Sequence, residues 1–295
     1  MASRTLIAYG NRCDEGTLSG GTWLSTLPLA NLQNRLIAKV ARSSGTTTAA
    51  TQFDINLGRA RRIGMLSLIG HNLTVVAKVR VRGDDASDFA TPLYDSGWVD
   101  VWPSGMIPPE LLEWEDDNFW LGTLSDQARA GYQSPFIHRV ASLPSLQYWR
   151  VEVDDTSNSD GYIQIGRLFL ADVWQPERGP VVGAAQGMGI DPTSMRLMVG
   201  AAIGMDDTTP VESSLGGSEY FDVRAKPRVH RFEMRAMNKD EAYSRVLDLQ
   251  NLIGVSGEIL IDPDYADAEN KPRRAFVGRL RSLSPVVESS PGVFD

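Results

Sequence analysis

Histidine is the first residue type to test for chemistry, because imidazole is both a common general base and a common metal ligand. The chain has three histidines, His71, His138 and His230, and none belongs to a His-Glu-x-x-His pattern. His71 lies in a Gly-His-Asn turn and His230 in an alternating apolar run, which favour a hydrogen-bonded loop imidazole and a packed side chain, respectively. No nucleophile elbow, Walker loop or dinucleotide-binding glycine pattern occurs. We therefore predict that the chain is not an enzyme and has no catalytic residues.

Oxygen-rich loops could hold calcium, since this ion prefers carboxylate and carbonyl ligands. Residues 156–161 are similar to the start of an EF-hand loop, but Arg167 occupies the position of its closing glutamate. Two further acidic loops contain Asp84, Asp85 and Asp88, and Asp262, Asp264, Asp267 and Glu269. Because aspartate is favoured in turns, these loops predict solvated turns. We expect no metal site and no cofactor.

Four tryptophans are candidates for stacking on a sugar, because an indole offers a flat apolar face to a hydroxyl-rich ring. They are Trp98, Trp102, Trp114 and Trp120. Trp98 and Trp102 would share one face of a predicted strand, where core packing or contact with an insertion is the competing interpretation. The planar polar side chains of His71 and Asn72 complete the predicted sugar contacts. Both interpretations stay open from the sequence.

Length and composition predict a folded protein of two domains. The chain has 295 residues, of which 42% are hydrophobic and 22% charged. The net charge of −8 comes without basic blocks, so we expect no nucleic-acid partner. No run approaches the roughly 20 apolar residues of a membrane helix, and the N-terminus lacks the pattern of a signal peptide. Cys13 is the single cysteine, so stability must come from burial. We expect a soluble protein made in the cytoplasm, without membrane insertion.

Short alternating or β-branched runs dominate the first part of the chain. Separated by Gly, Asp, Asn and Pro, they predict strands at 52–57, 62–69, 75–82, 97–102, 148–153 and 163–173. Several short strands without amphipathic helices between them favour an antiparallel sandwich. The proline-rich and aromatic stretch near 103–135 departs from this rhythm and is interpreted as an insertion. A glycine- and proline-rich stretch after Trp174 places a domain boundary at 175/176.

The second part contains one clear helix, predicted over 239–253. Ala242, Val246, Leu249 and Ile253 recur at helical spacing. Asn238 followed by Glu241 predicts the N-cap, and Gly254 the C-terminal stop. Strands are predicted at 195–202, 229–237, 258–261 and 275–283. The whole chain is thus predicted to be mainly β: a sandwich over 1–175, and an α+β domain over 176–295 with one main helix on a sheet.

The first part resembles the galactose-binding-like, or discoidin-type, jelly roll. The resemblance rests on Thr51-Gln52-Phe53-Asp54-Ile55-Asn56-Leu57-Gly58 and the following apolar strand to Asn72, and on Tyr148-Trp149-Arg150-Val151-Glu152-Val153 with the closing strand at 161–170. It covers about residues 20–174. Extracellular members of this family carry paired cysteines, which this chain lacks. The resemblance implies an antiparallel jelly roll used for attachment or assembly.

The second part resembles the ring-forming domains of long-tailed bacteriophage tail-tip proteins, including distal tail proteins. The matching segments are 229–237, 238–253, 257–262 and 273–283. This resemblance implies a structural component of a tail tip or baseplate, located in the virion and assembled in the bacterial host cytoplasm. Its partners would be copies of itself in a ring and other tail proteins. The alternative is a carbohydrate-binding attachment module that contacts a cell-surface glycan. A glycan-active enzyme with unrecognised carboxylates is a third class.

Overall fold

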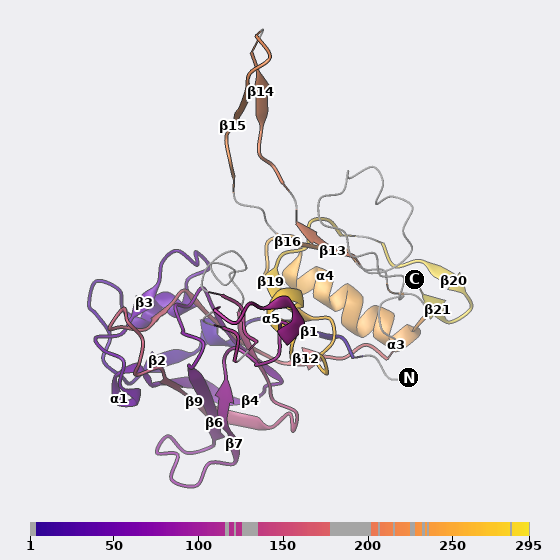
Figure 1. Ribbon diagram of the computed structural model, residues 1–295. Helices are drawn as coiled ribbons and strands as arrows, with labels where there is room; N and C mark the ends of the chain where they lie inside the picture. The colour runs from indigo at the N-terminus through magenta and orange to yellow at the C-terminus, as the bar shows by residue number, and fades with distance from the viewer. Residues whose placement is uncertain are drawn as a thin grey trace. The chain divides into compact units, whose positions relative to one another are not determined.

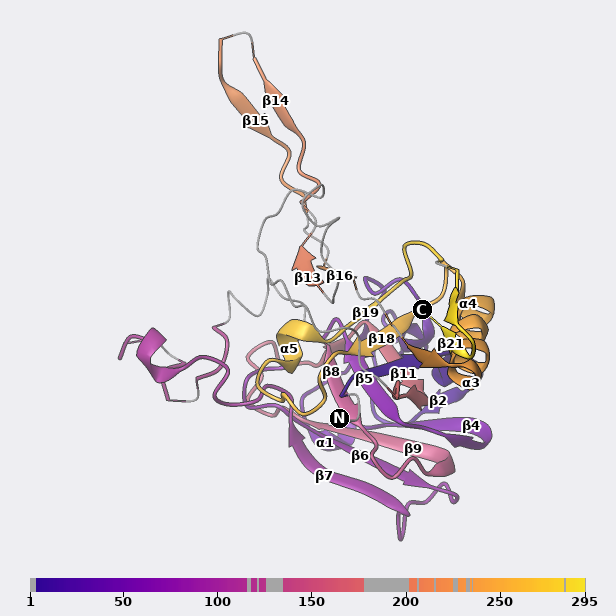
Figure 2. The ribbon, with the colours of Figure 1, turned by 90° about the vertical axis from the view of Figure 1, so that its right-hand side faces the viewer.

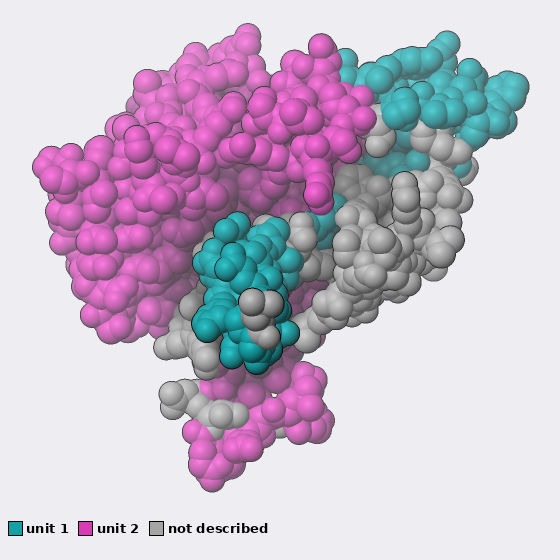
Figure 3. Space-filling view, turned by 90° about the horizontal axis from the view of Figure 1, so that it is seen from above, with its two compact units in different colours: residues 1–5, 176–248, 284–295 teal, residues 6–175, 249–283 magenta. Residues whose placement is uncertain are grey.

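The computed structural model describes residues 4–115, 118–120, 122–125, 135–177, 202–205, 207–214, 216–224, 228–231, 234, 236–283 and 285–294. Contacts divide the chain into two compact units, coloured separately in Figure 3. The sandwich unit comprises residues 6–175 and 249–283, and the hairpin unit comprises residues 1–5, 176–248 and 284–295. No helix in the described part of the chain is long and apolar enough to cross a membrane.

A five-stranded antiparallel sheet forms one layer of the sandwich unit. Its order is β2-β4-β9-β6-β7, with bounds Thr17–Ser19, Phe53–Arg62, Ser145–Asp154, Lys78–Asp84 and Tyr94–Asp100. In β4 the side chains of Phe53, Ile55 and Leu57 are buried and alternate with half-buried polar ones, as expected for a sheet with one face on a core. Figure 2 shows this layer below β5, β8 and β11.

The second layer is a three-stranded sheet of order β11-β5-β8, with bounds Arg167–Ala171, Met65–Ile69 and Phe136–Arg139. Every residue of β5 and β11 is buried. Leu66, Leu68, Leu168 and Leu170 belong to the core shared with the five-stranded sheet. Both faces of this sheet are therefore covered, and a further layer must lie on its other side.

That further layer is a four-stranded sheet of order β12-β1-β18-β19. Its strands span Val173–Trp174, Leu6–Tyr9, Ile259–Asp262 and Phe276–Gly278. Its apolar residues meet the outward side chains of the middle sheet in a second core, which includes Met65, Phe169, Leu6, Leu260 and Ala275. Strands from both ends of the sequence thus complete the sandwich unit.

Smaller elements complete this unit. The strands β3 (Ala41–Arg42) and β10 (Gln164–Ile165) pair with each other. Short helices are η1 (Arg12–Glu15), η2 (Leu29–Gln33), α1 (Thr48–Thr51), η3 (Pro109–Leu111) and α5 (Lys271–Arg274). The prediction of a mainly β chain with an antiparallel sandwich is confirmed.

The contacts do not divide the chain into the contiguous domains 1–175 and 176–295 of the sequence prediction. Residues 249–283 group with the sandwich unit because β18 pairs along its length with β1, from Leu6 opposite Asp262 to Tyr9 opposite Ile259. The apolar outer face of the middle sheet needs this cover. Sequence patterns locate strands, but they do not identify which distant strand pairs with which.

The predicted helix over 239–253 is confirmed. It runs as α3 (Lys239–Glu241), the π-helical η5 (Ala242–Leu247) and α4 (Asp248–Ile253), and Figure 1 shows one uninterrupted coil. Asn238 Oδ1 accepts a hydrogen bond of 2.7 Å from the Glu241 backbone N–H, which satisfies one free donor of the first turn. Gly254 ends the helix with a φ of +56°, which favours glycine.

The described residues of the hairpin unit form three small antiparallel sheets. The helix packs on the sheet β17-β21-β20 (Met237–Asn238, Val293–Phe294, Glu288–Ser290) through Ala242, Met237 and Phe294. The strands β13 (Ala202–Met205) and β16 (Arg228–Arg231) pair, as do β14 (Val211–Ser213) and β15 (Glu219–Phe221). Within the predicted strand at 229–237, described residues belong to β16 and β17. Most of the predicted strand at 195–202 and of the glycine-rich stretch lies outside the described residues.

Candidate functional site

Asn72, one predicted sugar contact, lies in the turn after β5. Its amide Nδ2 donates to Asp160 Oδ2 at 2.8 Å and to the Tyr162 carbonyl at 3.1 Å, and its Oδ1 accepts from the Gln164 N–H at 2.8 Å. All its side-chain groups are engaged within the protein. Asn72 therefore joins the loop after β5 to the loop before β10.

The loop that is similar to an EF-hand belongs to the same network. Asp155 is buried and accepts hydrogen bonds from the Thr74 backbone N–H at 3.0 Å and from the Thr74 hydroxyl. Asn158 donates to Asp155 Oδ2 at 2.9 Å and to the Asn72 carbonyl at 3.1 Å. These contacts hold two loops together by side-chain hydrogen bonds. In the described part of the chain no three His, Cys, Asp or Glu side chains are grouped to bind a metal.

Trp98 and Trp102 do not share a strand face, contrary to the sequence prediction. The strand β7 ends at Asp100, before Trp102. Trp102 is 6% exposed, and its Nε1 donates to the Leu73 carbonyl at 3.1 Å, whereas Trp98 is 43% exposed on β7 at the sheet edge. The His71 ring lies edge-on to Trp102 with centroids 6.0 Å apart. Of these three rings, Trp98 has the most accessible face.

His138 and His230 lie on strands. His138 on β8 contacts the Tyr94 hydroxyl through Nε2 at 2.7 Å. Burial, helped by the nearby charge of Lys271, lowers the pKa of His138 to about 4. His138 is therefore neutral at pH 7. His230 lies on β16 opposite Ile203.

An exposed aromatic cluster lies on the insertion between β7 and β8. We define it as Trp114, Phe119 and Trp120, whose ring centroids are 5.3–5.5 Å apart in all three pairs. The exposed fractions of Trp114 and Trp120 are 68% and 77%. Aromatic rings at this spacing attract each other, and their outer faces stay open to solvent. Such a surface suits either a sugar ring or an apolar patch of another protein.

The insertion is anchored to the sandwich on both sides of the aromatic cluster. Met106 before it and Leu124 after it are buried in the main core. The Ile107 N–H donates to the Gly122 carbonyl at 2.8 Å, and the Gly122 N–H donates to the Asn118 carbonyl at 2.8 Å. The aromatic cluster thus stands on a closed loop with fixed ends. Phe119 is not among the contacts predicted from the sequence, although it directly precedes the predicted Trp120.

No protein-family profile and no curated protein matches the chain. Among solved structures, the lectin domain of lectinolysin complexed with Lewis B antigen has 10% identity and a TM-score of 0.37, over 55% of this chain and 96% of that one. CBM32-1 from a family 31 glycoside hydrolase of Clostridium perfringens has 10% identity and a TM-score of 0.37, over 56% and 99%. A fucose-binding module from Streptococcus pneumoniae has 9% identity and a TM-score of 0.36, over 55% and 95%.

The likeness to these lectin and carbohydrate-binding domains therefore covers about 55% of the chain. None of the three solved structures is a tail protein by its description. The resemblance of the second part to tail-tip proteins stays a prediction.

Proposed function

We propose that the chain is a structural component of a bacteriophage tail tip or baseplate, which assembles with copies of itself and with neighbouring tail proteins. The observation that carries this proposal is the hairpin β14–β15. Val211 and Phe221 pair across it, and their exposed fractions are 53% and 58%; those of Tyr220 and Val223 are 65% and 78%. In the described parts of 207–224, only Thr209 is even half-buried. The hairpin is visible in Figures 1 and 2 as a long two-stranded ribbon.

A two-stranded hairpin of this kind has little stability of its own. Isolated hairpins are marginal in water, and unpaired strand edges favour association with other chains. Each large apolar side chain that becomes fully buried contributes about 1.5–3 kcal/mol. Burial of Tyr220, Phe221 and Val223 against a second copy would therefore stabilise both the hairpin and the assembly. This physical argument agrees with the ring that the tail-tip resemblance implies.

The test is the oligomeric state of the full chain, measured by size-exclusion chromatography with light scattering and by electron microscopy. We expect a closed ring for the native chain. The double variant Tyr220→Ser/Phe221→Ser should shift it toward monomer, because it removes exposed apolar surface that the assembly would bury. Leu93→Ser is the matched control, since Leu93 is 66% exposed in the sandwich unit.

A native chain that stays monomeric at high concentration would contradict the assembly proposal. Rings that persist unchanged in the double variant would contradict the role of the hairpin. Unchanged thermal unfolding of the double variant would show that loss of assembly does not come from misfolding.

The second candidate function is attachment to a glycan, and the aromatic cluster favours it. Two indoles with exposed fractions of 68% and 77% offer stacking faces on an anchored loop. A glycan array with the full chain tests this function. We expect binding to be lost in Trp114→Ala/Trp120→Ala and kept in Leu111→Ala, whose side chain is also exposed. Trp98→Ala separates the predicted contact on β7 from the aromatic cluster.

A further inference from the structure

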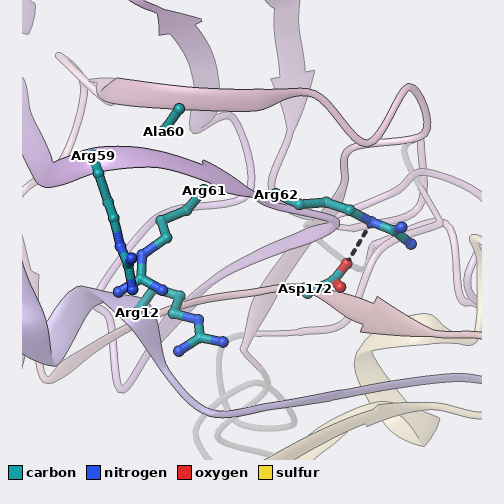
Figure 4. Close-up of a pocket in the computed structure, with 6 residues that line it drawn as sticks. All are labelled: Arg12, Arg59, Ala60, Arg61, Arg62 and Asp172. Atoms are coloured by element: carbon teal, nitrogen blue, oxygen red, sulfur yellow. Dashed lines mark ion pairs between the residues drawn. The ribbon is translucent and has the colours of Figure 1, made fainter.

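An open pocket of about 300 Å³ on the sandwich unit is dominated by arginine. Six residues line it (Figure 4): Arg12, Arg59, Ala60, Arg61, Arg62 and Asp172. Arg12 comes from η1, and residues 59–62 end the strand β4. The pocket thus gathers four guanidinium groups on a chain of net charge −8. The sequence reasoning found no basic block, although Arg59, Arg61 and Arg62 lie within four positions.

The backbone of β4 places these arginines. Its pairing with β9 is irregular between Asn56 and Arg61, and Gly58 has a φ of +72°. Arg59 lies within this irregular stretch and Arg61 ends it, and both side chains line the pocket. Figure 4 shows both reaching toward Arg12, while Arg62 extends away toward Asp172. Arg12, Arg59 and Arg61 therefore line one pocket from two elements.

The ion pairs leave positive charge in that space. Arg62 is paired with Asp172 at 3.0 Å. Glu15 forms ion pairs with both Arg61, at 2.7 Å, and Arg12, at 3.7 Å. Among the described residues, Arg59 has neither an ion pair nor a hydrogen-bond partner. Three positive groups around one carboxylate leave a formal excess of two positive charges.

We propose that this arginine pocket binds a monosaccharide-sized ligand that carries a carboxylate, sulfate or phosphate group. The guanidinium fork matches the geometry of these oxyanions and can bind them through two parallel hydrogen bonds. The volume lies at the lower end of small-molecule pockets, which suits one sugar ring. In this proposal Arg59 and Arg61 hold the anionic group. The pocket shares no residue with the aromatic cluster or with the hairpin, so its test does not depend on either proposed function.

The test is isothermal titration calorimetry of the full chain with pairs of probes that differ in charge. Glucuronate is compared with methyl glucoside, glucose 6-sulfate with glucose, and sodium sulfate is added as the free anion. We expect both acidic sugars to bind and the neutral ones to give no signal. The affinity should fall as sodium chloride is raised, because the site is open to solvent.

Variants locate the binding site. Arg59→Gln removes a charge without breaking an ion pair and is expected to weaken acidic-sugar binding about tenfold or more, the scale of a charged hydrogen bond. Arg61→Gln should weaken it further, because Glu15 then loses its closer ion pair, keeps only the longer one with Arg12, and repels the ligand more strongly. Arg35→Gln is the matched control: Arg35 is exposed and has no ion pair among the described residues, and its loss should leave the affinity within about twofold.

Three results would show that the pocket is not a site for acidic sugars. They are equal binding of glucuronate and methyl glucoside, absence of binding by every acidic probe, and unchanged affinity in Arg59→Gln. Sodium sulfate that binds as tightly as glucose 6-sulfate would show that the pocket takes a free anion, and would refute the sugar-sized ligand.

Discussion

Replacing Arg167 with methionine is expected to lower the free energy of unfolding of the sandwich unit by about 3–5 kcal/mol. Arg167 begins β11, and its side chain is fully buried. Nη1 and Nη2 bind the two carboxylate oxygens of Asp14 at 2.7 Å each. Nη2 also donates to Glu258 Oε2 at 2.7 Å, and Nε to the same oxygen at 3.2 Å. The position that the sequence reasoning used to reject a calcium loop is thus a buried ion-pair centre.

The magnitude follows from what the substitution leaves behind. Burial by itself would lower the pKa of Arg167, but the hydrogen bonds from Asp14 and Glu258 raise it above its ordinary value. Methionine keeps the apolar packing and removes the charge. The Glu258 side chain, only 10% exposed, then stays buried without its partner, and Asp14, 29% exposed, is partly relieved by water. Breaking a buried pair from one side costs more than removing the whole group of charges.

Urea unfolding followed by tryptophan fluorescence, to which the buried Trp149 contributes, measures the effect. The triple variant Asp14→Asn/Arg167→Met/Glu258→Gln should recover most of the loss, since it leaves no unpaired buried charge. Arg224→Met is the control, because its pair with Asp222 is exposed and contributes little. The reasoning is refuted if the single variant stays within about 1 kcal/mol of the native chain, or if the triple variant is no more stable than the single one.

Three further changes test the packing of the sandwich unit. Burial lowers the pKa of His138 from 6.5 to about 4, so its contribution to stability is complete above pH 6.5 and is lost progressively as the pH falls toward 4. The loss should amount to about 3 kcal/mol in urea titrations. His138→Gln should abolish this pH dependence of stability, and an unchanged dependence would contradict the role of His138. Burial, opposed by the charge of Lys271, raises the pKa of Asp262. The contribution of Asp262 to folding stability is therefore complete below pH 3.8 and is lost as the pH rises through the raised pKa. Asp262→Asn should therefore raise the melting temperature at pH 7, and a lower one would reject the explanation. A Cβ at Gly166 would lie 2.4 Å from the Ile37 carbonyl oxygen, so Gly166→Ala should cost about 1–3 kcal/mol, and an unaltered melting temperature would disprove the clash.

Local patterns in the sequence determined the type of most elements. Alternation of Phe53, Ile55 and Leu57 with polar residues predicted β4, because side chains of a strand point to opposite faces. The helix was predicted with both ends, because Asn238 and Gly254 act on the backbone within one turn. Such signals act between residues close in sequence, so they can be read without the fold.

The tertiary structure decided everything that depends on distant residues meeting. The cover of the middle sheet comes from β1 and β18, whose pairing no local pattern specifies. Trp98 and Trp102 differ in exposure because β7 ends between them. The arginine pocket forms only when η1 brings Arg12 to the end of β4. The net charge of the pocket depends on which carboxylates, such as Glu15, the fold places beside the arginines. The amino-acid composition gives the number of charged side chains, but the fold decides which of them lie close enough to pair and which remain unpaired.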